Sequence, residues 1–553
     1  MSLLKLIPLG GMGKVTQNMF LYEYEDEMLI VDMGIGFPEI QMLGVDVLIP
    51  DVRYVQTKLE EGKKIVGMVL THGHDDHIAA TPYILPHLPE FPILASPLTA
   101  GFAKNRMRDG AVEREITVVK DRQWYQVGRH FEVMPLHMTH SVPDTKHYAI
   151  KTPEGIIYHG SDFKLDKDPI DGQLSDLEMA TQLGQEGVLC MLIDCLRVER
   201  KERVGSESMA GPAIEEEVLT TKGKSVVTLM SSHIHRIQQV VDAAQKADRK
   251  ICFIGRSVEQ NVQEALQLKK LSIPYGMMVD KRDLGDYKNS QLCVVIAGSQ
   301  GQEGSSLVRA VYGEHHVISI TPEDKVIFSA DVIPGNEIPF YEAIDELCRN
   351  GIEVVYPDIK PNLHQSGHAS AQEQQELVRA VKPKYILPVG GADRHRVKFV
   401  EFVAEPLSIA PEKVLIPAHG EVLGFEGGQA KVVDHLSLHA QMVDGLGIGD
   451  VGPTVLADRR ILSEAGMIVL VIPKIKGQLQ LREMQVISRG FVFMKEADEV
   501  VKFIKDTTAE IINSLERNAK DDEVRRAIEK RLSRRLYKII KREPMIMAAI
   551  VKV

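Results

Sequence analysis

The sequence predicts a layered α/β protein in which a first domain is interrupted by an inserted parallel α/β domain and followed by a small α+β domain. Residues 1–160 alternate short strand-like runs with turns, and polar residues gather at the strand ends. From about residue 206, strands and amphipathic helices alternate, which is typical of a parallel sheet with crossover helices. The glycine-rich stretch 445–453 then precedes a third unit. We therefore expect a first domain at 1–195, the insertion at 196–355, the first domain resumed at 356–446, and a linker with the C-terminal domain at 447–553.

The composition is that of an ordinary globular protein, with 44% hydrophobic and 26% charged residues in a chain of 553. No apolar run approaches the roughly 18–20 residues of a membrane span, and the first residues lack the layout of a signal peptide. The five cysteines form no CxxC pair and mostly lie in apolar runs, as reduced core residues do. We expect a cytoplasmic protein without a membrane partner.

The net charge of −11 argues against a broad basic surface for duplex binding, but it is compatible with a local basic channel. Lysine and arginine are concentrated in residues 517–542, on a helical pattern. Two interpretations remain open there. The helix face is either solvated and ion-paired to Glu516, Asp522 and Glu529, or it contacts RNA.

The most informative stretch is residues 71–77, Thr-His-Gly-His-Asp-Asp-His, which directly follows the apolar run 65–70. The run predicts a buried strand, so the cluster lies on the loop that leaves its end. A strand end holds the first ligand rigidly, and the turn at Gly73 lets the others converge. Neutral imidazole and carboxylate together suit zinc or manganese, and two ligand types can serve two adjacent ions.

Two further ligands are expected from later strand ends, His140 and Asp162. A carboxylate at 162 can bridge two cations and hold them roughly 3.5–4 Å apart. Such a pair of ions generates hydroxide and stabilises a phosphoryl or acyl transition state. His137, His147 and His159 are expected to pack or hydrogen-bond instead. Metal ligation alone does not choose between phosphodiester, thioester and amide substrates.

These residues resemble those of a known superfamily. The cluster 72–77 with His140 and Asp162 is similar to the metallo-β-lactamases, and the loop 364–370 (His-Gln-Ser-Gly-His-Ala-Ser), with the inserted domain, resembles the β-CASP nucleases. Further segments resemble the ribonuclease J family, namely 9–13, 17–18, 31–39, 232–236, 255–257, 298–301, 333–337, 458–460 and 487–491. The resemblance covers essentially the whole chain. It implies a metallo-β-lactamase αββα sandwich interrupted by a β-CASP domain, plus the small C-terminal domain.

The resemblance also implies a function. It points to a 5′→3′ exoribonuclease with additional endonuclease activity, acting on single-stranded RNA with a preference for a 5′-monophosphate. Two divalent ions are expected, with zinc first and manganese or magnesium as alternatives. The family further implies a homodimer or homotetramer, a role in RNA decay and maturation, and partners in an RNA-decay complex.

The family's site residues can be carried over by position. One metal is expected on His72, His74 and His140, the other on Asp76 and His77, with Asp162 as the bridge. Asp76 would also orient the attacking hydroxide, and His368 would stabilise the scissile phosphate or assist the leaving group. The segments expected to bind the substrate comprise His233, Ile234, His235, His364, Gln365, Ser366, Gly367 and His368.

The pattern breaks at Gly390, where the family has a histidine ligand of the second metal. His395, His419 or Asp393 would have to replace it, or the second site is weakened. His233 also departs from the family, which has asparagine there. Two alternatives to an active nuclease follow. One is a catalytically attenuated paralogue that binds RNA or serves as a scaffold, which Gly390 favours. The other is a hydrolase of a small thioester or lactam, which the inserted domain argues against.

Overall fold

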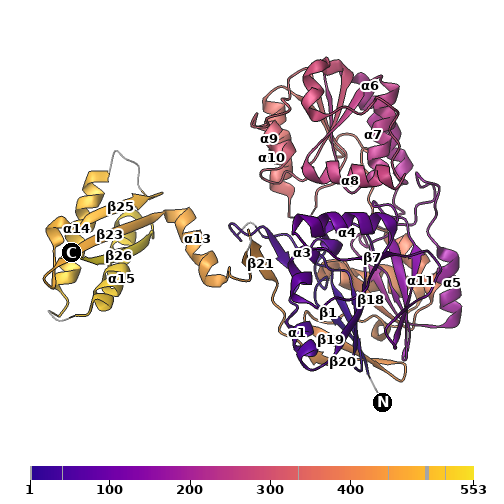
Figure 1. The fold of residues 1–553 in the computed structure, drawn as a ribbon, viewed down its shortest axis with the longest axis horizontal. Helices are drawn as coiled ribbons and strands as arrows, with labels where there is room; N and C mark the ends of the chain where they lie inside the picture. The colour runs from indigo at the N-terminus through magenta and orange to yellow at the C-terminus, as the bar shows by residue number, and fades with distance from the viewer. Residues whose placement is uncertain (1–2, 40, 334, 446, 492–496, 517–518) are drawn as a thin grey trace. The chain divides into compact units, whose positions relative to one another are not determined.

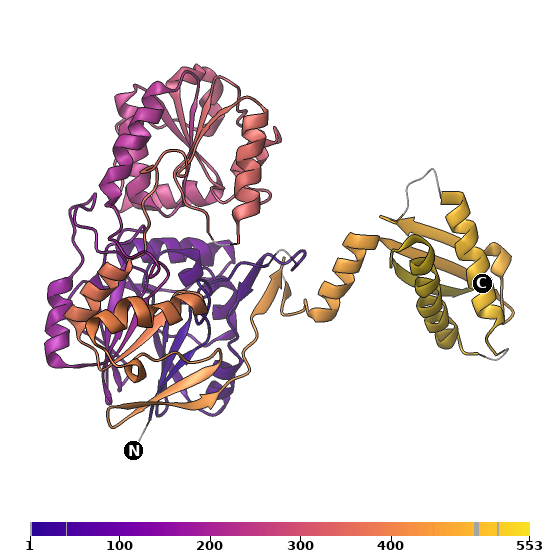
Figure 2. The same cartoon turned by 180° about the vertical axis from the view of Figure 1, so that it is seen from behind.

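The computed structural model describes residues 3–553 except 40, 334, 446, 492–496 and 517–518, so one residue of the glycine-rich stretch and the start of the basic segment lie outside it. Figures 1 and 2 show the chain from two opposite sides. Its contacts divide the chain into two compact units. One contains the residues up to Phe37 and Leu48–Gln441, and the other contains Pro38–Val47 and Met442–Val553. The domain boundaries expected from the sequence remain a prediction.

The first unit contains two facing sheets. One has eight strands in the order β20 (Gln429–His435), β19 (Glu421–Glu426), β1 (Leu4–Pro8), β2 (Phe20–Tyr24), β3 (Glu27–Val31), β5 (Lys64–Val69), β6 (Ile93–Ala95) and β7 (Ile116–Val118). The other has six, in the order β18 (Tyr385–Val389), β12 (Val188–Asp194), β11 (Gly155–His159), β10 (Lys146–Thr152), β9 (Phe131–His137) and β8 (Tyr125–Val127).

A large apolar core lies between these sheets, with Tyr22, Phe131 and Phe425 among its buried residues. A second core lies between the six-stranded sheet and helices α5 (Leu177–Glu186) and α11 (Ala371–Val381). Helix α4 (Pro97–Asp109) packs on β6 and β7 of the other sheet. Strands covered on both faces form continuous apolar runs, and β12 is buried along its whole length. These layers, helix–sheet–sheet–helix, confirm the fold class predicted from the sequence.

The inserted part contains a five-stranded parallel sheet in the order β14 (Lys250–Ile254), β15 (Leu292–Ile296), β13 (Ser225–Thr228), β16 (Lys325–Phe328) and β17 (Glu353–Val355). Helices α6 (Ala210–Thr220) and α7 (Ile234–Lys246) lie on one side of it, and α9 (Ser306–Val311) and α10 (Glu337–Arg349) on the other (Figure 1). The strand–helix alternation seen in the sequence is thus a doubly covered parallel sheet.

The second unit contains a sheet centred on β23 (Met467–Ile475), which pairs with β24 (Gln478–Leu479), β25 (Gln485–Arg489) and β26 (Met545–Lys552). Helices α14 (Ala497–Asn513) and α15 (Asp521–Ile540) share one apolar core with this sheet. Helix α13 (Pro453–Ala465) precedes β23. Across the described residues of both units, the helices are too short or too polar to span a membrane.

One buried arginine joins the inserted domain to the loop before residue 364. The Arg236 side chain is completely buried and donates hydrogen bonds to Glu207 (2.5 and 2.7 Å), to Ser329 Oγ (2.7 Å) and to the Leu363 carbonyl (3.0 Å). Although burial favours a neutral carboxyl, Arg236 and His233 hold the pKa of Glu207 well below its ordinary value. Arg236→Ala would leave that carboxylate buried without its main partner.

We therefore expect Arg236→Ala to lower the free energy of unfolding by about 3–5 kcal/mol. Urea denaturation followed by circular dichroism measures the effect. Arg282→Ala is the matched control, because it removes an arginine whose ion pair with Asp280 is exposed. Equal unfolding midpoints for the two variants would contradict the prediction.

Candidate metal centre

Six histidine and aspartate side chains meet where loops leave the ends of three strands. His72 and His74 follow β5, and His74 is the N-cap of the short helix α2 (Asp75–Ile78), which carries Asp76 and His77. His140 follows β9 and Asp162 follows β11. The two sheets therefore bring together ligands separated by up to 90 residues of sequence.

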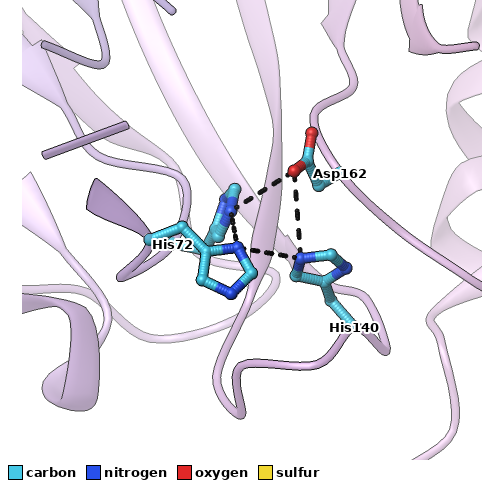
Figure 3. A group of neighbouring side chains, drawn as sticks. His72, His140 and Asp162 are labelled. Carbon is cyan, nitrogen blue, oxygen red and sulfur yellow. Dashed lines mark hydrogen bonds and ion pairs between the residues drawn. The ribbon is translucent and has the colours of Figure 1, made fainter. Parts of the chain in front are cut away.

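The first group comprises His72, His74, His140 and Asp162, whose ligand atoms lie within 4.8 Å of one another. His74 Nδ1 lies 3.1 Å from His72 Nε2 and 3.2 Å from His140 Nε2. Asp162 Oδ2 lies 3.6 Å from His72 Nε2 and 3.9 Å from His140 Nε2. Figure 3 shows the rings of His72 and His140 converging with the Asp162 carboxylate. Zinc bonds of 2.0–2.2 Å in a tetrahedron place ligand atoms about 3.3 Å apart, so the group fits one such ion.

Burial keeps these histidines in the form that binds metal. It holds the pKa values of His72 and His140 well below the ordinary value and lowers the pKa of His74 to about 3. The rings are therefore neutral and offer a lone pair. Although burial also favours protonation of Asp162, His77 and His368 hold the pKa of this carboxyl well below its ordinary value. The group is thus three neutral imidazoles and one carboxylate, a set that suits zinc.

Hydrogen bonds on the far sides of the rings fix which nitrogen faces the centre. His140 Nδ1 lies 2.7 Å from the Gly367 carbonyl and His77 Nδ1 lies 2.7 Å from Asp32 Oδ2. Since each Nδ1–H donates to its oxygen, Nε2 is the nitrogen that faces the cluster. Asp32 also accepts hydrogen bonds from the backbone and hydroxyl of Thr71, both at 2.7 Å. Its carboxylate is thereby held in place behind His77.

The second group has only three members, Asp76, His77 and Asp162. His77 Nε2 lies 3.7 Å from Asp76 Oδ2 and 3.6 Å from Asp162 Oδ2. Although burial disfavours a charged ring, Asp76 and Asp162 raise the pKa of His77 well above its ordinary value. The carboxylates that attract a proton to this ring equally favour a cation beside it. The group fits a divalent ion, with fewer protein ligands than the first.

Gly390 lies beside this second group. A Cβ placed on it would be 3.7 Å from Asp162 Oδ1 and 3.3 Å from Asp194 Oδ1, and its backbone is left-handed with φ +67°. A side chain at this position would therefore point into the cluster. Glycine has no side chain and provides no ligand there.

The three residues considered as replacements point elsewhere. His395 lies with Nε2 3.6 Å from Glu199, Asp393 is exposed and pairs with Arg396, and His419 is exposed. Within the described residues, none of the three belongs to a group able to hold a metal ion.

Next to both groups, His368 pairs with Asp194. His368 Nδ1 lies 2.8 Å from Asp194 Oδ2, and the other Asp194 oxygen accepts the Leu196 backbone N–H at 2.8 Å. Although burial disfavours the charged ring, Asp194 and Asp162 raise the pKa of His368 to about 9. The geometry therefore presents a protonated imidazole at the edge of the cluster, where it can donate to an anion.

The predicted substrate-binding segments come together only in part. Gly367 contacts the centre through its carbonyl bond to His140, and the Ser366 hydroxyl accepts the His368 backbone N–H at 3.1 Å. Gln365 instead donates to Asn362. His364 lies 4.0 Å from Asp331.

On the inserted domain, His233 is buried beside Glu207 with Nε2–Oε2 at 3.3 Å, and Ile234 is fully buried. His235 lies 3.5 Å from Asp171 and lines a small pocket together with His140. Burial lowers the pKa of His233 to about 4, so this ring is neutral and adds no charge for an anion. Ile234 offers no side chain to a substrate.

Sequence reasoning missed two residues of the site, Asp194 and Asp32. Asp194 is the last residue of the apolar strand β12, and Asp32 directly follows the apolar strand β3. Asp162 similarly follows β11. That position was the available signal, because the ends of neighbouring strands meet at one edge of a sheet. His147 and His159 bond to Tyr158 and Tyr22, as expected of histidines that do not bind metal.

Comparison with known proteins places the chain in one family. Four family models match successive parts of it: the metallo-beta-lactamase superfamily (residues 12–162), the ribonuclease J beta-CASP domain (222–347), the Zn-dependent metallo-hydrolase RNA specificity domain (351–405) and the ribonuclease J C-terminal domain (454–553). A crystal structure of a protein of unknown function from Enterococcus faecalis has the same fold over 76% of this chain and all of its own, with a TM-score of 0.53 and 13% identity.

Two curated relatives extend over nearly the whole chain. Ribonuclease J 1 of Streptococcus pyogenes is 33% identical over 98% of this chain and 96% of its own length. Ribonuclease J of Thermus thermophilus is 36% identical over 99% of this chain and 95% of its own. With this identity maintained from end to end, the chain belongs to the ribonuclease J family.

Proposed function

We propose that this chain is a metal-dependent ribonuclease that hydrolyses RNA phosphodiesters. The observation that carries the proposal is the pair of ligand groups that share Asp162, with the protonated His368 beside them. The relatives' names supply the substrate class, since both are called ribonuclease J. The family supports 5′→3′ exonuclease action on single-stranded RNA with a 5′-monophosphate, together with endonuclease action. It also supports assembly as a homodimer or homotetramer and membership of an RNA-decay complex.

Bound divalent ions supply a hydroxide at neutral pH and positive charge for the phosphate oxygens. The chain's own groups then have separate tasks. Asp76 accepts a hydrogen bond from the attacking water and orients it. His368 donates a hydrogen bond or proton to the scissile phosphate or the departing oxygen, and Asp194 keeps its ring protonated and oriented.

The proposal is tested on a 5′-monophosphorylated single-stranded RNA with zinc, manganese or magnesium. We expect release of mononucleotides from the 5′ end, much slower release from a 5′-triphosphorylated RNA, and none from Asp76→Ala. RNA that is bound but uncleaved with every metal would contradict the nuclease and support the second candidate, an attenuated RNA-binding paralogue. Gly390 is the observation that favours that second candidate.

We further propose that the two ions are held unequally, because the first group has four ligands and the second has three. The expected result is one ion per chain that survives dialysis against a weak chelator and one that is lost. Mass spectrometry of the metals measures both. Gly390→His is the matched variant, and it should retain more of the second ion despite a modest cost for its left-handed backbone. Equal retention of two ions in the unaltered chain would refute the inequality.

A further inference from the structure

The outer face of α15 carries a row of four exposed cations that the proposed mechanism does not use. Arg526, Lys530, Arg534 and Lys538 are spaced by four residues and are all exposed; these four are called the basic row below. The buried positions of the same helix are Val524, Ile528, Leu532 and Leu536. The basic row lies two residues, or about 200°, further around the helix. It therefore faces away from the core of the domain.

The four cations of the basic row differ from the neighbouring cations of α15 in their partners. Among the described residues, no side chain forms an ion pair or hydrogen bond with any of its four cations, whereas their neighbours Arg525, Arg531 and Arg535 bond to Asp522, Ser514 and Glu510. Like charges four residues apart on a helix repel one another. A row whose cations repel one another, and which lacks partners in the described part of the domain, is suited to an external anion.

Helix stabilisation does not account for the row. Cations favour the last turn of a helix because of the helix dipole, and only Lys538 lies there. Positive charge is also concentrated in this segment of the chain. Residues 521–542 contain nine Lys and Arg against four Asp and Glu, in a chain whose net charge is −11. Of the ion pairs expected in this segment, Arg525 pairs with Asp522, whereas Arg535 pairs with Glu510 instead. The described residues pair no acidic side chain with the basic row.

An exposed aromatic ring lies among these cations. Tyr537 is 47% exposed, and Lys541 Nζ lies 5.5 Å from the centre of its ring. Tyr537 is three residues from Arg534, or about 60° around the helix, so its ring borders the basic row. Cations that contact phosphates and an aromatic ring on which a base stacks are the combination that binds single-stranded nucleic acid. The exposed ring therefore favours nucleic acid over a purely electrostatic partner.

We propose that the basic row and Tyr537 form an additional binding site for single-stranded RNA on the C-terminal domain. The row extends over about 18 Å, since its ends are twelve residues apart on a helix. The site raises affinity for RNA long enough to occupy both it and the catalytic site. The inference rests on the proposed function in one respect, that RNA is the ligand.

The test uses the full-length chain with His368→Ala, so that RNA is not consumed. Binding of 5′-monophosphorylated RNAs of 5 and 30 nucleotides is measured by fluorescence anisotropy over a range of salt concentrations. We expect the triple variant Lys530→Gln, Arg534→Gln, Lys538→Gln to bind the 30-mer about tenfold or more weakly at low salt. The slope of log affinity against log salt should fall by about 2, and affinity for the 5-mer should not change. Tyr537→Ala should weaken the 30-mer without altering the slope.

The matched control is Arg525→Gln, Arg531→Gln, Arg535→Gln, which removes the same charge from the same helix. This control should retain most of the affinity for the 30-mer. Equal losses in both triple variants would show a general field effect and overturn the site, as would an unchanged 30-mer affinity in the row variant. If the row variant lost binding to anionic vesicles but not to RNA, the site would belong to a membrane surface instead. Failure of either RNA to bind the parent protein would refute the proposed function, and this site with it.

Discussion

Asp162→Ala is expected to abolish RNA hydrolysis, with kcat lowered by at least about 10³-fold. Asp162 belongs to both ligand groups of the centre and also lies close to Asp194 and His368. Its removal takes one predicted ligand from each metal position and, among the described residues, the one carboxylate that the two groups share. Steady-state hydrolysis of a 5′-monophosphorylated RNA and the metal content of the purified variant are the measurements.

The control for this variant is Asp168→Ala, which removes an exposed aspartate six residues away along the chain and outside the ligand groups. It should retain both activity and metal. Loss of activity in Asp162→Ala without any loss of metal would show that Asp162 acts on the substrate instead of on the ions. Retention of activity would remove the basis of the proposed centre.

His368→Ala is expected to lower kcat by about 10²–10⁴-fold while the metal content stays unchanged. The His368 ring contacts Asp194 through its Nδ1, and Asp194 was not predicted as a metal ligand. The centre of the His368 ring lies 5.2 Å from that of the His140 ring. It is placed to donate to the reacting phosphate and contributes nothing to the first ligand group. Hydrolysis rates at saturating RNA, with metal analysis of the same samples, measure both effects.

Asp194→Asn accompanies this variant, because the amide keeps the size of the side chain but removes the charge that raises the pKa of His368. We expect it to lower kcat by less than His368→Ala and to leave the metal content unchanged. If His368→Ala lost metal as well as activity, the role assigned to His368 would be wrong. A change confined to KM would assign His368 to substrate binding instead.

Much of the centre could be predicted from sequence because its ligands are concentrated locally. His72, His74, Asp76 and His77 are within six residues, so their types and spacing indicate a metal before any fold is known. His140 and Asp162 were found because each follows a strand. Asp194 and Asp32 follow strands too, but a single aspartate after an apolar run is common. Only their contacts with His368 and His77 give them a role.

The sequence by itself determined the fold class, the family and the identities of the predicted ligands. Apolar periodicity specifies strands and helices, and clustered donors specify metal chemistry. Only the tertiary structure decided which distant groups meet. It brought Gly390 beside Asp162, turned His395 toward Glu199, and separated the partnered cations of α15 from the basic row. The physical reason is that donor type is a property of one residue, whereas coordination, pairing and burial depend on how sheets and helices pack.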